Sequence, residues 1–176
     1  GLAGAGEWGT LRKLLPDFKD KRVLDLGCGY GWHCIYAMEH GASSVVGVDI
    51  SHKMLEVAKE KTHFPQVEYK CCAIEDVEFP EESFDVILSS LAFHYVADYE
   101  ILVKKIYRIL KSGGKLVFTV EHPVFTAYGT QDWHYNEKGE ILHFPVDNYY
   151  YEGKRTAVFL GEKVTKYHRT LTTYLN

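Results

Sequence analysis

A short apolar run that leads directly into a cluster of glycines is the strongest constraint on how this chain folds. The run Val23-Leu24-Asp25-Leu26 is followed by Gly27-Cys28-Gly29-Tyr30-Gly31, and helical periodicity begins at Trp32. Glycines at alternate positions allow the backbone to turn tightly and to approach a ligand closely. Asp49 ends the next apolar run, roughly twenty residues later, a spacing that places a carboxylate beside a ribose. The segment predicts a strand, a ligand-binding loop and a helix.

Further apolar runs alternate with helical patterns as far as residue 120. Strands are expected at 45–48, 67–71, 84–88 and 115–120, and helices at 8–15, 32–40, 53–61 and 101–110. Ser51 is a good N-cap for the helix over 53–61, and Lys111-Ser112-Gly113-Gly114 predicts a stop before the last strand. Continuous apolar strands that alternate with helices indicate a parallel sheet covered by helices on both faces.

Two classes of nucleotide-binding domain share this arrangement, and the loop spacing separates them. Dinucleotide dehydrogenases carry GxGxxG, whereas this loop runs GxGxG and has Trp32 where their third glycine would fall. Asp25, the acid just before the loop, also suits a ligand with a positively charged sulfonium, because a nearby carboxylate attracts that charge. The loop therefore favours a sulfonium cofactor over a dinucleotide.

The motifs together resemble those of class I S-adenosylmethionine-dependent methyltransferases, over roughly residues 7 to 121. Residues 46–51 resemble the ribose-binding strand end of the family, and residues 73–79 resemble its adenine loop. Residues 83–96 resemble its fourth strand with the methionine-side segment, and residues 110–114 resemble its turn into strand five. The resemblance implies that S-adenosylmethionine is the cofactor. It assigns cofactor binding to Asp25, Gly27, Cys28, Gly29, Gly31, Asp49, Ile50, Ser51, Ile74, Glu75, Ser90 and Leu91. Ala73 stands where the family often has Asp, so the backbone near Ile74, or Glu75, is expected to read the base.

The resemblance implies an α/β fold of the Rossmann-like, doubly wound type, with a mainly parallel sheet and helices on both faces. The family sheet ordinarily has seven strands, of which the last two form an antiparallel hairpin; here that hairpin is expected to be missing. We expect a cofactor-binding core over 7–121 and a substrate-side segment of the same domain over 122–176, cut short at its end. Within that segment, 158–164 is expected to pair as a strand with residues near Tyr149, and 165–176 has helical character.

Candidate catalytic residues are histidines placed after strands four and five or near the end of the chain. His94 follows strand four, Glu121 and His122 follow strand five, and His168 lies in the expected last helix. A general base assists methyl transfer when the acceptor is a hydroxyl or a protonated amine. For His94 and His168, packing or a solvated helix face is an equally good interpretation.

Composition excludes several partners. The net charge is -4 and the basic residues are scattered, which argues against nucleic acid. The four cysteines lack metal-ligand spacing, so no metal is expected, and they fit a reducing cytoplasm. No apolar run approaches the roughly twenty residues that span a bilayer.

The expected function is methyl transfer to a small-molecule acceptor in the cytoplasm. A nucleic-acid or protein methyltransferase is disfavoured, because Ser89-Ser90-Leu91-Ala92 stands where amino-directed enzymes carry an Asn-Pro-Pro-Tyr-like motif. The alternative from another class is a protein that binds the cofactor without turnover, as a sensor or partner subunit. The acceptor atom, the use of a general base and the oligomeric state stay open.

Overall fold

The computed structural model describes residues 1–127, 132–159 and 161–176, which belong to two compact units. The first, here called the sheet unit, comprises Gly1–Phe93 and Asp98–Thr119. The second, here called the C-terminal unit, comprises His94–Ala97 and the described part of Val120–Asn176. The division differs from the expected one because the short segment His94–Ala97 belongs to the C-terminal unit.

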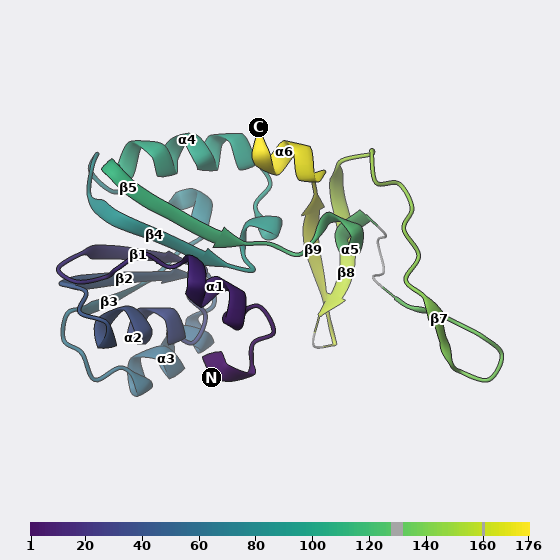
Figure 1. The fold of residues 1–176 in the computed structure, drawn as a ribbon, viewed down its shortest axis with the longest axis horizontal. Helices are drawn as coiled ribbons and strands as arrows, with labels where there is room; N and C mark the ends of the chain where they lie inside the picture. Colours follow the sequence, from purple (N-terminus) through teal and green to yellow (C-terminus); the bar gives the residue numbers. More distant parts are fainter. Residues whose placement is uncertain (128–131, 160) are drawn as a thin grey trace. The chain divides into compact units, whose positions relative to one another are not determined.

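The sheet unit alternates helices and strands along the chain (Figure 1). Its elements are η1 (Leu2–Gly4), α1 (Trp8–Leu14), β1 (Arg22–Leu26), α2 (Trp32–Glu39), β2 (Ser44–Asp49), α3 (His52–Lys61), β3 (Val67–Cys71), η2 (Ile74–Asp76), β4 (Phe84–Ser90), α4 (Tyr99–Ile109) and β5 (Leu110–Thr119). A further short helix, η3 (Phe93–Tyr95), leads from one unit into the other along the chain.

The five strands form one parallel sheet in the order β3-β2-β1-β4-β5. The chain moves outward from β1 through β2 to β3, and then returns to the other side of β1 for β4 and β5. Right-handed crossovers in opposite directions place their helices on opposite faces of a sheet. Figure 1 shows α2 and α3 on one face and α4 on the other. The predicted Rossmann-like, doubly wound fold is confirmed.

The sheet unit follows from local signals that the sequence carries. Val23, Leu24 and Leu26 of β1 are fully buried, as the continuous apolar run predicts. Helix α3 begins at the predicted cap, because the Ser51 hydroxyl accepts a hydrogen bond from the Met54 N–H. In α4, the buried side chains recur at the spacing of one helical face: they are Leu102, Ile106 and Ile109.

One predicted break inside this unit is wrong. The segment Lys111-Ser112-Gly113-Gly114 lies within β5, which runs from Leu110 to Thr119. Its pairing register with β4 shifts between Phe84 and Val86. Gly113 has φ +77°, so the residues that predicted a turn form a local irregularity instead of a stop.

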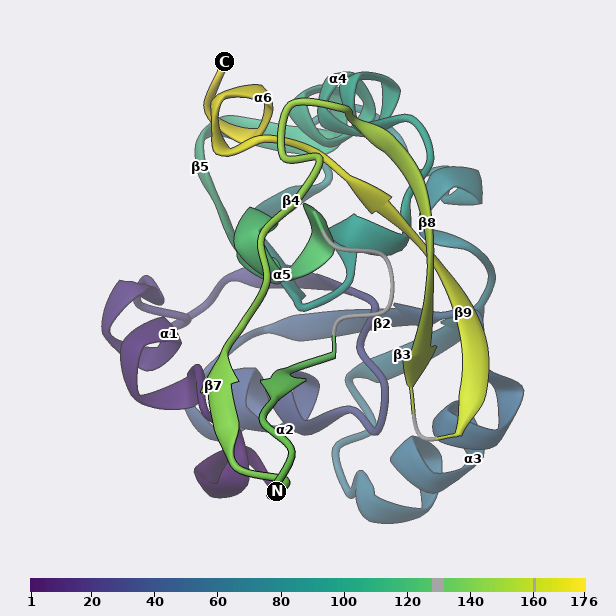
Figure 2. The ribbon, with the colours of Figure 1, turned by 90° about the vertical axis from the view of Figure 1, so that its right-hand side faces the viewer.

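The C-terminal unit is built mainly from two antiparallel hairpins. Its elements are α5 (Pro123–Ala127), β6 (His134–Tyr135), β7 (Ile141–His143), β8 (Gly153–Phe159), β9 (Glu162–His168) and α6 (Leu171–Leu175). Strands β8 and β9 pair from Gly153↔His168 to Phe159↔Glu162 (Figure 2). Within the described residues, neither hairpin joins the five-stranded sheet, in agreement with the expected absence of the family's antiparallel pair.

Two predictions for this unit are wrong. Residues 165–168 belong to β9, so His168 lies in a strand and only Leu171–Leu175 is helical. The predicted strand over 158–164 is divided between the end of β8 and the start of β9, and residue 160 lies outside the described residues. The cause is visible in β9, whose buried positions are Lys166 and His168 rather than apolar residues. The strand therefore lacks the period-two apolar signal.

Candidate functional site

The loop between β1 and α2 stays attached to the neighbouring strand at the carboxyl edge of the sheet. The N–H groups of Gly27 and Cys28 both donate to the Val48 carbonyl, at 2.8 and 2.9 Å. Gly27, Gly29 and Gly31 all have positive φ, between +53° and +78°. The loop therefore needs glycine at each of these positions, as the sequence predicted.

The three glycines nevertheless have different surroundings. A Cβ atom on Gly27 would collide with the Cβ of Ala92, and one on Gly31 would collide with the Tyr69 hydroxyl. A Cβ on Gly29 would meet only Met54 Sδ, at 3.9 Å. Gly27 and Gly31 thus allow close packing within the protein, whereas Gly29 presents its backbone to open space. That space is where a ligand could approach the loop.

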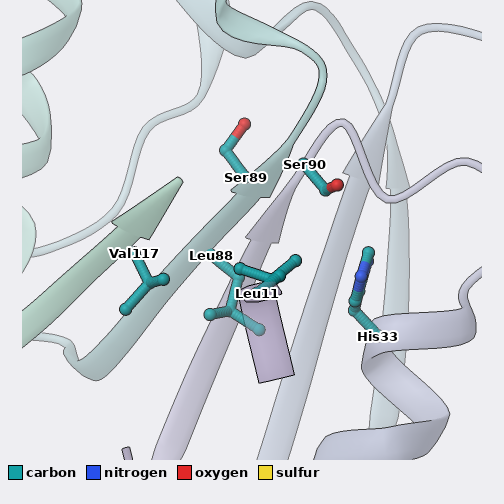
Figure 3. A pocket seen from close by; sticks show the side chains of 6 residues that line it. All are labelled: Leu11, His33, Leu88, Ser89, Ser90 and Val117. Atoms are coloured by element: carbon teal, nitrogen blue, oxygen red, sulfur yellow. The ribbon is translucent and has the colours of Figure 1, made fainter. Parts of the chain in front are cut away.

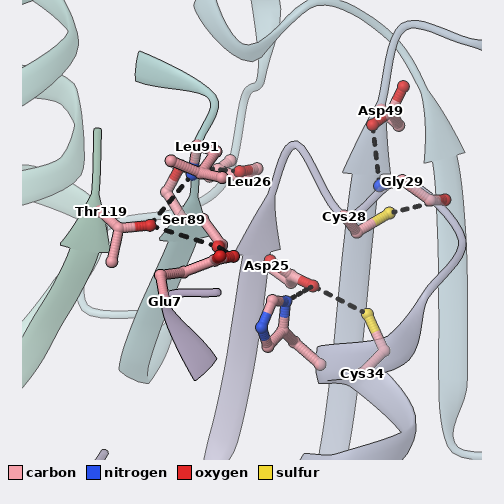
Figure 4. A network of polar contacts seen from close by, with 12 residues as sticks. Glu7, Asp25, Leu26, Cys28, Gly29, Cys34, Asp49, Ser89, Leu91 and Thr119 are labelled. Carbon is pink, nitrogen blue, oxygen red and sulfur yellow. Dashed lines mark hydrogen bonds and ion pairs between the residues drawn. The ribbon is translucent and has the colours of Figure 1, made fainter. Parts of the chain in front are cut away.

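Asp49, at the end of β2, is held in place by the backbone (Figure 4). Its Oδ2 accepts a hydrogen bond from the Gly29 N–H at 2.8 Å, and its Oδ1 accepts one from the Ser51 N–H at 2.8 Å. A carboxylate oxygen has two lone pairs, so each oxygen can accept a further hydrogen bond from a ligand hydroxyl. Asp49 is therefore oriented in advance to bind two neighbouring hydroxyls.

Asp25 lies beneath the loop and is fully buried. Its Oδ2 accepts a hydrogen bond from Cys34 Sγ at 3.5 Å and lies 4.0 Å from His33 Nδ1. Its Oδ1 is buried and has no hydrogen-bond partner among the described residues. Burial raises the pKa of the Asp25 carboxyl, and His33 opposes that shift. A buried acceptor without a partner is uncommon in native proteins, and it indicates a site that a further polar group completes.

Four more of the predicted cofactor-binding residues are Ile74 and Glu75 of the expected adenine loop, Ile50 after β2, and Cys28 of the glycine loop. Ile74 begins η2, and its Cδ1 lies 3.5 Å from the position that a Gly27 Cβ would take. Ile50 follows Asp49 directly and is 74% exposed. The Glu75 side chain is exposed, and its carbonyl accepts a hydrogen bond from Lys105 Nζ at 2.6 Å. Cys28 differs, because its side chain is buried.

The carboxyl ends of β4 and β5 carry a second group of polar contacts. Ser90 Oγ donates to Glu7 Oε1 at 3.2 Å and lies 3.2 Å from Thr119 Oγ1. The Leu91 N–H donates to the Thr119 carbonyl at 2.9 Å, with Leu91 at φ +53°. The sequence predicted Ser90 and Leu91 as cofactor-binding residues, but it did not predict that Glu7 and Thr119 would lie beside them. No local motif marks either residue.

A narrow recess, with no room for a water molecule, lies on the sheet beneath α1 (Figure 3). It is lined by Leu11, His33, Leu88, Ser89, Ser90 and Val117. Ser89 Oγ is turned inward and donates to the Leu26 carbonyl at 2.8 Å. The recess therefore has apolar walls and a polar rim at the end of β4.

The predicted catalytic histidines all lie in the C-terminal unit. His94 is buried, and its Nδ1 accepts a hydrogen bond from the Glu121 N–H at 3.4 Å. Desolvation lowers the pKa of His94 to about 4 against the opposing effect of Glu121. A base with so low a pKa has little driving force for accepting a proton near pH 7.

His168 and His122 have different environments. His168 is buried, with Nδ1 2.8 Å from Thr126 Oγ1 and Nε2 2.8 Å from the Tyr149 carbonyl. Both of its ring nitrogens are therefore engaged. His122 is exposed, and its Nδ1 accepts a hydrogen bond from the Val124 N–H at 3.2 Å. Within the described part of the chain, no hydrogen bond joins the three histidines, and their catalytic role stays a prediction.

The described residues contain neither a metal-ligand cluster nor a membrane-spanning helix. No group of three or more His, Cys, Asp or Glu residues there could hold a metal ion. Within the same residues, no helix is both long and apolar enough to cross a membrane.

Comparisons with known proteins identify the family of this chain. A family profile described as "Methyltransferase domain" matches residues 24–118. A crystal structure from Listeria monocytogenes, assigned to the S-adenosylmethionine-dependent methyltransferases, is 58% identical with a TM-score of 0.92; the match covers 97% of this chain and 80% of that one. One from Mesorhizobium loti, of the same class, is 41% identical with a TM-score of 0.91, over 100% of this chain and 80% of that one.

A curated relative is the ubiquinone biosynthesis O-methyltransferase of Coxiella burnetii, 36% identical over 62% of this chain. The chain spans about half, 47%, of that enzyme's length.

The sheet, its glycine loop and the acid at the end of β2 define a Rossmann-like methyltransferase domain. The chain belongs to the class I S-adenosylmethionine-dependent methyltransferase family. S-adenosylmethionine is its cofactor, and the residues present fit that molecule. Asp49 offers a prepared acceptor pair for a ribose, and Gly29 leaves open space at the loop. Among the described residues, the buried Asp25 Oδ1 has no hydrogen-bond partner.

Proposed function

We propose that this protein transfers a methyl group from S-adenosylmethionine to a small-molecule acceptor. The observation that carries the proposal is the likeness to an enzyme named for ubiquinone biosynthesis, which is 36% identical over 112 residues. The net charge of -4 also supports a small acceptor, because a polyanion would meet overall repulsion. We further propose that the protein acts in the cytoplasm, without nucleic-acid or membrane partners.

The bound cofactor supplies an electrophilic methyl group attached to a sulfonium. The chain's own residues fix the position of that molecule. Asp49 would hold the ribose hydroxyls, and the loop around Gly29 would let the ligand contact the backbone. Ile50 and Ile74 would flank the base, and the Asp25 carboxyl would lie beneath the loop. Placement of the reactants contributes much of the rate in displacements of this kind.

Acceptor recognition is proposed for residues of the C-terminal unit. His122 is the candidate for contact with the acceptor, because it is exposed while His94 and His168 are buried. His94 and His168 would act as positioning residues that keep the polar interior of this unit in order. In this proposal His122 contacts the acceptor, whereas His94 and His168 support the unit that carries it.

Transfer of a labelled methyl group tests the proposal. The protein is incubated with methyl-labelled cofactor and a panel of phenols, amines and thiols, and both labelled products and demethylated cofactor are measured. We expect label in at least one low-molecular-mass acceptor, and none with the Asp49→Ala variant. Label that appears only in added RNA or protein would contradict the small-molecule assignment. Tight cofactor binding without turnover on any acceptor would favour a sensor or partner subunit.

A further inference from the structure

We propose that Glu7 is a cofactor-binding residue, whose carboxylate accepts hydrogen bonds from the α-ammonium group of the cofactor's methionine part. Glu7 lies outside residues 24–118, over which the family profile matches. The inference rests on the cofactor assignment above and concerns the same site.

The Glu7 side chain is directed away from its own helix. Glu7 is the N-cap residue of α1, yet its side chain makes no capping hydrogen bond. A carboxylate at this position commonly accepts hydrogen bonds from the first N–H groups of the helix. Here Oε1 instead accepts from Ser90 Oγ, at the end of β4, and Ser90 contacts Thr119 at the end of β5. The carboxylate is therefore placed at the edge of the sheet (Figure 4).

Helix α1 is anchored, which fixes the position of Glu7. Trp8 packs edge-on against Tyr36 of α2, with ring centroids 4.8 Å apart, and lies 5.7 Å from the ring of His33. Leu11 is 3% exposed and lines the recess together with Leu88. Glu7 and the recess are thus parts of one packed arrangement within the sheet unit.

The charge along this edge suits a cation. Figure 4 shows Asp49, Asp25 and Glu7 in sequence across the carboxyl ends of the strands. Among the described residues, no lysine or arginine forms an ion pair with any of the three. Carboxylates without a lysine or arginine partner at a ligand edge favour a positively charged ligand group.

The chemistry of the cofactor assigns that group. S-adenosylmethionine carries two cationic groups, the sulfonium and the α-ammonium. A sulfonium has no N–H or O–H to donate, whereas an ammonium has three donors. Asp25 is fully buried beneath the loop, whereas Glu7 is half-buried at the edge of the sheet and can accept a hydrogen bond from an incoming ligand. The α-ammonium is therefore the partner that fits Glu7.

A calorimetric comparison of two ligands tests this inference. The ligands are the demethylated product S-adenosylhomocysteine, which keeps the α-ammonium and lacks the sulfonium, and its analogue without the α-amino group. The variant is Glu7→Gln, which keeps the size of the side chain and an acceptor for Ser90. We expect it to bind the product about tenfold more weakly, the order of one charged hydrogen bond, and to bind the analogue as the wild-type protein does.

The control and the opposing outcomes separate this role from a structural one. Glu39→Gln removes the same charge from the exposed last residue of α2 and should leave both affinities unchanged. Equal weakening of both ligands by Glu7→Gln would mean that Glu7 only fixes α1, and unchanged affinity for the product would also overturn the inference. Failure of the wild-type protein to bind either ligand would instead overturn the cofactor assignment.

Discussion

Two carboxylates, one in each unit, are held in opposite ways. In the sheet unit, Asp49 is held by two backbone N–H groups and faces a loop with open space at Gly29. In the C-terminal unit, Glu121 is paired with the buried Lys166, whose Nζ lies 2.6 and 2.8 Å from its two oxygens. A carboxylate supported by the backbone keeps its charge for a ligand, whereas one paired with a lysine has its charge compensated internally. The contrast indicates binding in the first case and stability in the second.

Asp49→Ala is expected to have the largest effect. The substitution removes a carboxylate prepared for two ribose hydroxyls and also releases the Gly29 and Ser51 N–H groups. Charged hydrogen bonds contribute roughly 1.5–3 kcal/mol each, so cofactor affinity should fall at least about a hundredfold. Calorimetry on the folded variant measures this loss of affinity. Asp49→Asn keeps one acceptor, so its affinity should lie between those of the wild-type protein and Asp49→Ala. Unchanged affinity for Asp49→Ala would remove Asp49 from the site.

Lys166→Met tests the second half of the comparison. Removal of the lysine leaves Glu121 without the cation that compensates it, and the Lys166 side chain is only 3% exposed. Removing one partner of a buried ion pair lowers the free energy of unfolding by roughly 3–5 kcal/mol. Because Glu121 is partly exposed, the loss expected here is about 3 kcal/mol. Denaturant unfolding measures the loss, and adding Glu121→Gln should restore part of it.

The exposed pair Lys104–Glu100 provides a matched control. Lys104→Met removes the same kind of side chain from a solvent-exposed ion pair, so no measurable loss of stability is expected. Equal losses for Lys104→Met and Lys166→Met would contradict a stabilising role for the C-terminal pair.

The pH dependence of the free energy of unfolding should reveal the protonation of His94. The pKa of His94 is about 4 in the folded protein, below its ordinary value near 6.5. The unfolded chain therefore takes up the proton first, and stability is lost as the pH falls from about 6.5 to 4. The loss from this one residue is at most about 3 kcal/mol. His94→Gln should flatten the stability profile over that range.

His52→Gln is the control for this measurement, because the His52 side chain is 74% exposed. Its stability profile should follow that of the wild-type protein between pH 6.5 and 4. If His94→Gln left the profile as steep as in the wild type, His94 would not be a buried neutral group.

The sheet unit could be predicted from the sequence because its signals are local. The apolar run of β1, the glycines that follow it and the Ser51 cap each lie within a few residues of the structure they specify. Asp49 could be placed from its spacing to the loop, since parallel strands end at the same edge of a sheet. The spacing could not reveal the difference among the three glycines, which depends on Ala92, just after β4, and on Tyr69 of β3.

The C-terminal unit could not be predicted in the same way because its order depends on distant partners. Lys166 and His168 occupy the buried positions of β9, so the strand resembles a polar helix in sequence. Their partners, Glu121 and Thr126, lie more than forty residues away along the chain. The contact between Glu7 and Ser90 could not be predicted for the same reason, because it joins residues 83 positions apart.

Gly29→Val provides the most direct test of the cofactor site, with Gly113→Val as its matched control. Both glycines have positive φ, and an added Cβ would have no close contact at Gly113 and only Met54 Sδ, at 3.9 Å, at Gly29. Both variants should lose a similar, modest amount of stability from backbone strain, about 1–2 kcal/mol. Calorimetric titration with S-adenosylmethionine should show binding lost in Gly29→Val and retained in Gly113→Val. A folded Gly29→Val variant that binds the cofactor like the wild-type protein would contradict the assignment of this loop as the cofactor site.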